Sequence, residues 1–148
     1  MGKRRRAREL ALQVLFSLEF SADDPDRAFE LICENFSFSK PVRSFSKKLV
    51  LEVCKHKGEL DRLIEKASEN WRLERMSRLD KCILRLAALE ITLIEDIPPR
   101  VSIDEAVEMG KKFGSEDSGR FINGILAVSY THLRAHETVL DLVCRLLL

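Results

Sequence analysis

The residues best suited to chemistry gather at the N-terminus, where five cations fall within six positions: Lys3, Arg4, Arg5, Arg6 and Arg8. The chain as a whole carries a formal charge of +1, so the rest of the sequence is net negative. A local cation cluster on a near-neutral protein indicates a polyanion bound at one site. Arginine suits this role, because its planar guanidinium can hold two phosphate oxygens and can stack on an exposed base.

Two other interpretations of this cluster are open, a frayed and solvated terminus or a targeting segment. The cations lead directly into residues 10–20, which have the pattern of a buried helix, and not into a linker. We therefore favour the polyanion site.

A second candidate stretch lies at residues 111–124, which read K-K-F-G-S-E-D-S-G-R-F-I-N-G. It combines cations, glycine breaks and an aromatic residue at the start of a predicted helix. Backbone N–H groups there could meet a phosphate, and Phe121 could offer its face to an unstacked base. The alternative, which the residue types alone favour slightly, is that Phe121 is a core residue packed with Ile125.

No catalytic or metal-binding pattern is recognisable in the sequence. It contains no glycine-rich phosphate loop, no nucleophile elbow and no helical H-E-x-x-H. His56 lies between two lysines and is expected to be exposed to solvent. Carboxylates are spread along helix faces, where ion pairing is their usual role. His132, His136 and Cys144 are not interpreted as a metal site, because they fall in an atypical tail described below.

Length and composition fit one ordinary globular domain. The chain has 148 residues, of which 45% are hydrophobic and 33% are charged, and no apolar stretch has the length of a membrane span. A secretory signal is not expected, since polar residues interrupt the first apolar segment. The cysteines are widely spaced, which predicts free thiols in a reducing cytoplasm. They are Cys33, Cys54, Cys82 and Cys144.

Apolar residues recur with helical spacing along the whole chain, which predicts an all-α bundle of about seven helices. Pro98 and Pro99 are expected to end the fifth helix, whose Arg78, Lys81 and Arg85 should lie on its solvated face. A capping box then predicts the next helix start. Seven helices are expected, in this order: residues 10–20, a helix that starts at Pro25, one from Ser44 to near Gly58, residues 60–67, one from Ser77 to about Glu95, one from Ser102 to Gly114, and a last helix that starts at about Asp117.

Motifs shared with one known family are spread along most of the chain. They are R-R-R-A-R at 4–8, A-L-Q at 11–13, Trp71, I-L-R-L-A at 83–87 with Glu90, I-P at 97–98, V-S-I-D-E-A-V at 101–107, K-K-F-G at 111–114, E-D-S at 116–118 and F-I-N-G at 121–124. By these motifs, the chain resembles the NusB family of bacterial transcription antitermination factors over about residues 3–126.

The resemblance implies an all-helical fold of two small bundles that share a long N-terminal helix. It also implies an RNA-binding factor and not an enzyme. Members of the family pair with NusE, a small-subunit ribosomal protein that doubles as a transcription factor. Together they hold the single-stranded boxA element of nascent ribosomal RNA and help RNA polymerase to pass terminators. A homodimer in the absence of partners is left open.

Site residues follow from the resemblance by position, and no cofactor or metal is implied. The RNA would be contacted by Lys3, Arg4, Arg5, Arg6 and Arg8, with Gly114, Ser115, Glu116, Asp117 and Phe121 nearby. NusE would be contacted by Phe16, Glu74 and Asp80, and the two acids suit a basic ribosomal protein.

An alternative within the same resemblance is the detached RNA-binding domain of a ribosomal-RNA methyltransferase. No Rossmann-type unit follows in this chain, so the chain alone could not hold the methyl donor.

The C-terminal segment departs from the family pattern. Residues 127–148 read A-V-S-Y-T-H-L-R-A-H-E-T-V-L-D-L-V-C-R-L-L-L, and residues 141–148 back-translate to a common sequencing-adapter sequence. We therefore predict an RNA-binding domain at 1–126 and a tail at 127–148 that is a read-through of non-native DNA. The alternative is an unusual native helix.

Overall fold

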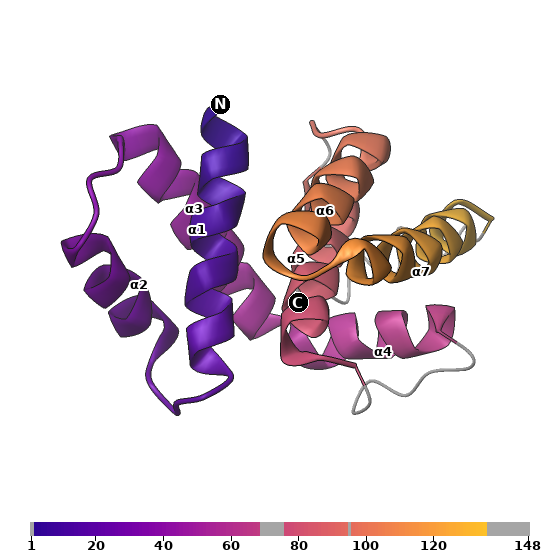
Figure 1. Ribbon diagram of the computed structural model, residues 1–148, viewed down its shortest axis with the longest axis horizontal. Helices are drawn as coiled ribbons and strands as arrows, with labels where there is room; N and C mark the ends of the chain where they lie inside the picture. Colours follow the sequence, from indigo (N-terminus) through magenta and orange to yellow (C-terminus); the bar gives the residue numbers. More distant parts are fainter. Residues whose placement is uncertain (1, 69–75, 95, 136–148) are drawn as a thin grey trace. The chain divides into compact units, whose positions relative to one another are not determined.

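The computed structural model describes residues 2–68, 76–94 and 96–135, with side chains described as far as residue 128. Within these ranges the chain forms helices and no strand, which confirms the predicted all-α class (Figure 1). The helices are α1 (Lys3–Leu18), α2 (Pro25–Glu34), α3 (Lys40–Lys55), α4 (Lys57–Ala67), α5 (Arg78–Leu93), α6 (Pro99–Phe113) and α7 (Glu116–Ala135).

The chain divides into two compact units, Met1–Lys55 and His56–Leu148, and each is described by itself. In the first unit, α1 packs against α2 and α3. Apolar residues at helical spacing on α1 supply one side of the core and Phe29 of α2 and Leu49 of α3 fill the other. The fully or almost fully buried apolar residues of α1 are Ala7, Leu10, Ala11, Leu12, Val14 and Leu15.

In the second unit, α5 is the central helix and packs against α4, α6 and α7. Every residue from Cys82 to Glu90 is buried, so this helix is enclosed on all sides along two turns. Such complete burial requires neighbours on several faces, and the three surrounding helices supply them. The side chains of Ile122 and Leu126 on α7 complete this core.

The first helix was expected over residues 10–20, but α1 begins at Lys3, so the cations lie within the helix. The third and sixth helices also begin earlier than predicted, in both cases because a proline supplies the first turn. The third helix begins at Lys40 and includes Pro41, whereas the sequence predicted Ser44. The sixth begins at Pro99 and not at Ser102. Proline fits the first turn of a helix, since its missing N–H would have no helical partner there and its φ is already helical.

Two polar residues predicted to face solvent are buried. The Arg85 side chain is only 7% exposed, and its Nε and Nη2 donate to Asp61 of α4 at 2.6 and 3.1 Å. His56 is also buried, and its Nδ1 lies 3.2 Å from Glu59 Oε2. The carboxylate partners offset the cost of removing the Arg85 guanidinium and the His56 Nδ1 from water.

The backbone of α7 runs unbroken from Glu116 to Ala135, across the predicted boundary between the domain and its tail. Residues 136–148, and with them His136 and Cys144, lie outside the described residues. The read-through origin of the tail stays a prediction, which the genomic DNA downstream of codon 126 would test.

Glycines allow α6 and α7 to approach each other closely. A Cβ at Gly110 would lie 2.8 Å from Ile122 Cδ1 and 3.4 Å from the backbone of Gly119. We expect Gly110→Ala to lower the free energy of unfolding by about 1–3 kcal/mol, because overpacking outweighs the better helix propensity of alanine. Thermal unfolding followed by circular dichroism would measure this change.

Gly124 on α7 is the matched control, since a Cβ there would meet nothing within 4 Å among the described residues. Gly124→Ala should raise stability by about 0.5–1 kcal/mol through helix propensity alone. Equal effects at the two glycines would show that the close approach at Gly110 carries no cost.

Candidate nucleic-acid interface

The predicted cation cluster lies in the first turns of α1. Lys3, Arg4, Arg5 and Arg6 are all exposed, and the backbone N–H of Arg6 donates to Gly2 O at 3.1 Å. No side chain caps this helix, and its first turn contains no acid. Cations are disfavoured at this end of a helix, where the helix dipole is positive. Placing them there opposes local stability and concentrates positive potential, as an anion-binding site requires.

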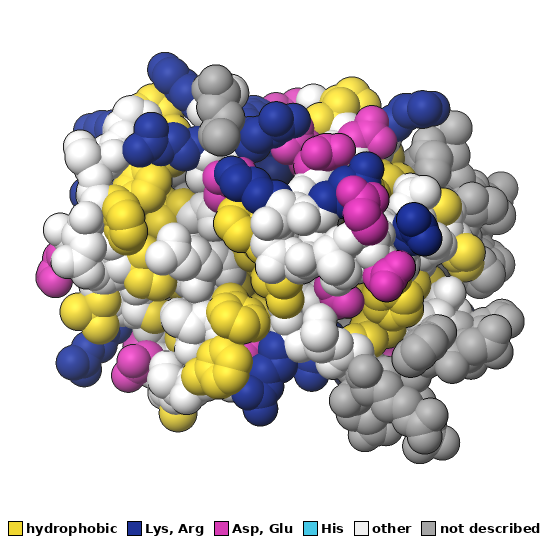
Figure 2. Space-filling view, in the orientation of Figure 1, with side chains coloured by type: hydrophobic (Ala, Val, Ile, Leu, Met, Phe, Trp, Pro, Cys, Tyr) yellow, Lys and Arg dark blue, Asp and Glu magenta, His cyan; other side chains and the backbone are white. Residues whose placement is uncertain are grey.

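Aromatic rings lie beneath two of these arginines. The guanidinium carbon of Arg4 is 4.8 Å from the ring centroid of Phe45, on α3. That of Arg6 is 5.0 Å from the ring centroid of Phe38, in the α2–α3 connection. Arg6 Nη2 also donates to the carbonyl of Ser37 at 3.1 Å. In Figure 2, Lys and Arg side chains surround the N-terminal end of α1, at the top of the first unit.

Sequence reasoning missed both rings. The segment 36–45 contains three phenylalanines, two in the α2–α3 connection and one near the start of α3. This clustering is the only available signal, and it does not reveal which cation each ring meets. The rings of Phe36 and Phe38 also lie together, with centroids 6.0 Å apart.

Arg8 differs from the other four cations, because it is only 3% exposed. It lies on the same helical face as Leu12 and Leu15, four and seven residues further along α1, and both are buried. The structure therefore gives Arg8 a place in the packing of α1, and its contact with RNA stays a prediction.

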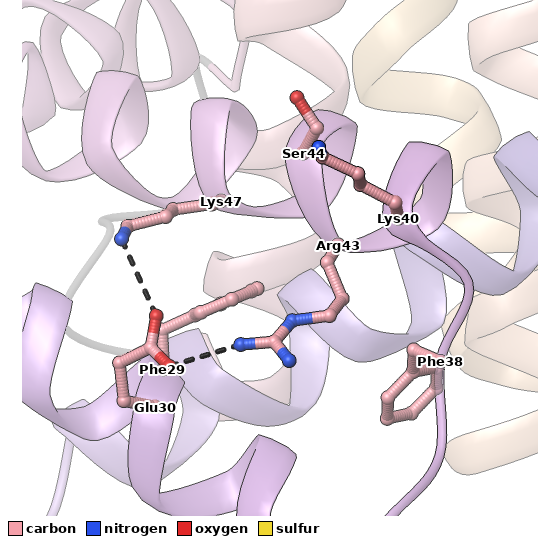
Figure 3. Close-up of a pocket in the computed structure, with 7 residues that line it drawn as sticks. All are labelled: Phe29, Glu30, Phe38, Lys40, Arg43, Ser44 and Lys47. Carbon is pink, nitrogen blue, oxygen red and sulfur yellow. Dashed lines mark hydrogen bonds and ion pairs between the residues drawn. The ribbon is translucent and has the colours of Figure 1, made fainter.

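A hollow of about 460 Å³ lies beside this surface, between α2 and α3 (Figure 3). Glu30 of α2 points into it and accepts from Arg43 Nη2 at 3.0 Å and from Lys47 Nζ at 3.3 Å. Lys47 Nζ also lies 2.7 Å from Asp26 Oδ1. The hydrogen bonds that Lys47 donates to Asp26 and Glu30 raise its pKa above the usual value. Cations paired in this way attract an external phosphate less than cations without a neighbouring carboxylate do.

The second candidate stretch lies in the other unit, at the turn between α6 and α7. Gly114, Ser115, Glu116 and Asp117 are all exposed, and the Ser118 N–H donates to Ser115 Oγ at 3.2 Å. Gly114 ends α6 as predicted, its N–H donating to Gly110 O at 2.9 Å.

The start of α7 is less suited to binding an anion than the start of α1. Glu116 and Asp117 occupy the first turn of α7, where their carboxylates already interact with the positive end of the helix dipole. Phe121 is half-buried, between the two predicted extremes of core and free surface. Ile122 beside it is fully buried and anchors this part of α7.

The residues predicted to contact NusE have different environments. Phe16 is half-buried, and its ring meets that of Phe20 edge-on with centroids 5.0 Å apart. Phe20 itself is 61% exposed, which leaves an aromatic surface at the end of α1. Asp80 is only 8% exposed and lies in the first turn of α5, where its N–H donates to Ser77 Oγ at 3.1 Å. Glu74 lies outside the described residues.

Among the described residues, no three His, Cys, Asp or Glu side chains gather as a metal site would require. Cys33, Cys54 and Cys82 are free thiols, and burial raises the pKa of the Cys33 thiol. No helix in the described part of the chain is long and apolar enough to cross a membrane.

Comparison with known proteins places this geometry in a family. The model of the NusB family matches residues 5–130. The transcription antitermination protein NusB of Desulfatibacillum aliphaticivorans is 48% identical to this chain, over 93% of this chain and 96% of the relative. That of Syntrophus aciditrophicus is 46% identical over 90% and 83%. These relatives are named as antitermination proteins, which does not favour the methyltransferase alternative.

Solved structures agree with the sequence relatives. The NusB chain from T. maritima superimposes with a TM-score of 0.81 at 33% identity, covering 93% of this chain and 96% of that one. The crystal structure of the antitermination factors NusB and NusE in complex with dsRNA matches with a TM-score of 0.80 at 28% identity, covering 88% and 97%. A family model over most of the chain and relatives at nearly half identity agree, and this chain belongs to the NusB family.

Proposed function

We propose that this protein is a non-catalytic, RNA-binding transcription antitermination factor that acts with NusE on boxA-type RNA of nascent ribosomal transcripts. Its place of action is the cytoplasm, in the transcribing RNA polymerase complex. The observation that carries the proposal is the exposed run Lys3–Arg6 at the positive end of α1, with Arg4 and Arg6 over aromatic rings.

Single-stranded RNA is the form of RNA that we propose for this surface. Unpaired bases can stack on aromatic side chains or on guanidinium planes, whereas the bases of an A-form duplex are out of reach in its deep groove. The relative whose structure contains NusE was solved with dsRNA, so both forms belong in the test.

NusE is the proposed protein partner. Phe16 and its neighbour Phe20 give an aromatic surface at the C-terminal end of α1, and aromatic side chains are common anchors of protein interfaces. Glu74 and Asp80 remain proposed contacts to a basic partner. The second candidate stretch, Gly114–Asp117 with Phe121, remains a proposed part of the RNA site.

The test is a titration of fluorescently labelled boxA-type single-stranded RNA with the full chain, with NusE present and absent. We expect saturable binding that tightens when NusE is added and weakens as salt rises, since phosphate contacts release counterions. Controls are a scrambled single strand and the same RNA annealed to its complement.

Each outcome of this titration bears on the proposal. Absence of binding to any RNA in the presence of NusE would refute the function. Tighter binding to the duplex than to the single strand would overturn the proposed RNA form and leave the partner intact. Light scattering on the same samples would determine whether the chain forms a homodimer without its partners.

A further inference from the structure

We propose that Phe38 and Phe45 are positioning residues of the RNA site, which hold Arg6 and Arg4 as flat plates for unpaired bases to stack on. This inference rests on the proposed function and adds to it how the site distinguishes bases from a bare phosphate backbone. The two rings come from the α2–α3 connection and from α3, so the site extends beyond the basic end of α1.

The distances support stacked pairs. The guanidinium carbons of Arg4 and Arg6 lie 4.8 and 5.0 Å from the ring centroids of Phe45 and Phe38. Both distances are within the range of about 6 Å in which a ring attracts a cation above its face. A guanidinium has two faces. When a ring covers one face and the arginine side chain is exposed, as it is for Arg4 and Arg6, the other face can receive a base.

Arg6 is fixed by a second contact. Its Nη2 donates to the carbonyl of Ser37 at 3.1 Å, in the residue preceding the ring that it covers. A ring and a carbonyl together limit the rotation of the side chain, so less conformational entropy is lost when RNA binds. The Phe36 ring packs beside Phe38 with a centroid distance of 6.0 Å, and this limits the positions that Phe38 can adopt.

Attraction of phosphate by charge alone would not require an aromatic ring beneath each arginine. Arg43 and Lys47 on the same unit have no described ring beneath them and are paired with Glu30 and Asp26. Arg4 and Arg6 instead each lie over an aromatic ring at the start of α1. A carboxylate neutralises a cation, whereas a ring beneath a guanidinium leaves its charge in place and holds it flat, so the geometry at Arg4 and Arg6 favours base stacking.

The experiment compares the wild-type chain with the double variant Phe38→Leu and Phe45→Leu on boxA-type single-stranded RNA. Leucine keeps apolar bulk at both positions and removes the flat ring. We expect the affinity to fall about 10-fold, on the scale of one stacked base. The slope of log affinity against log salt should stay unchanged, since no cation is removed.

An RNA of the same length in which the bases are replaced by abasic sites separates stacking from mere support of the arginines. We expect the wild type and the double variant to bind the abasic strand equally. If the variant also binds the abasic strand more weakly, or its salt slope falls, the rings serve phosphate contacts and base stacking is refuted.

Leu51→Ala is the control. Leu51 is an exposed apolar residue of α3 in the same unit, six residues beyond Phe45 and outside the proposed RNA and NusE contacts, and RNA binding should not change. Equal RNA affinity of wild type and double variant overturns the inference alone. Failure of the wild type to bind RNA overturns the proposed function itself.

Discussion

Replacing Arg4, Arg5 and Arg6 together by alanine is expected to weaken binding of boxA-type RNA about 100-fold at about 0.1 M monovalent salt. All three side chains are exposed at the positive end of α1. Each cation that neutralises a phosphate of a single strand adds about 0.7 to the slope of log affinity against log salt, so the variant should lose about 2 units of slope. At one-tenth molar salt, that loss corresponds to two orders of magnitude in affinity.

The measurement is fluorescence anisotropy over a range of salt concentrations. Because counterion release vanishes near 1 M salt, the lines of the wild type and the variant should converge as that concentration is approached. Two parallel lines would show that the arginines act through something other than phosphate contacts, and coincident lines would remove them from the site. Far-UV circular dichroism should show unchanged helical content.

A double variant, Arg43→Ala and Lys47→Ala, is the control for charge. It removes two cations of the same unit, the exposed Arg43 and the half-buried Lys47, but these are already paired with Glu30 and Asp26. Their removal should change the salt slope little, since the neighbouring carboxylates already balance them. A loss of slope equal to that of the arginines at the start of α1 would mean that RNA binding is not localised at that end.

Helix ends were predictable wherever the signal is local. Asp24 before Pro25 predicts the start of α2, and the Asp24 carboxylate does accept from the Arg27 N–H at 3.3 Å. Ser77 caps α5 in the same way, through the Asp80 N–H. Ser102 has the sequence signature of a cap too, but the preceding prolines begin the helix earlier. Ser102 is then buried within α6, where its hydroxyl donates to Glu90 Oε1 at 3.3 Å.

Buried polar residues were not predictable, because their partners lie far away in the sequence. Arg85 shares a helix with Arg78 and Lys81 and has the same spacing as a solvated residue. Only the packing of α4 on α5 brings Asp61, 24 residues earlier, to its guanidinium. A periodicity argument assigns faces to a helix, but it cannot tell whether a neighbouring helix offers a carboxylate.

The candidate site was predictable in its charges and not in its rings. The run of cations is contiguous in the sequence and needs no fold to be seen. The contacts of Arg6 with Ser37 and Phe38 bridge 31 residues or more, and they depend on how the α2–α3 connection passes the start of α1. Arg8 is the opposite case. It belongs to the run of cations in the sequence, but in the fold it lies on the packed face of α1 and is buried.

Arg85→Ala is expected to lower the free energy of unfolding by about 3 kcal/mol, because it leaves the Asp61 carboxylate in a poorly solvated position without its partner. The pair is bidentate, with N–O distances of 2.6 and 3.1 Å, and the two side chains are only 7% and 22% exposed. The shift in the thermal midpoint should be about 6–12 °C for a chain of this size.

A double-mutant cycle with Asp61→Ala isolates the pair from the packing that Arg85 also provides. The double variant should be less destabilised than the sum of the two single variants, by about 2 kcal/mol. Arg43→Ala is the control, since its pair with Glu30 is 44% and 47% exposed and should be worth at most about 0.5–1 kcal/mol. Additive effects of Arg85→Ala and Asp61→Ala would mean that the arginine stabilises α5 through its aliphatic part alone, and that the ion pair contributes nothing to the fold.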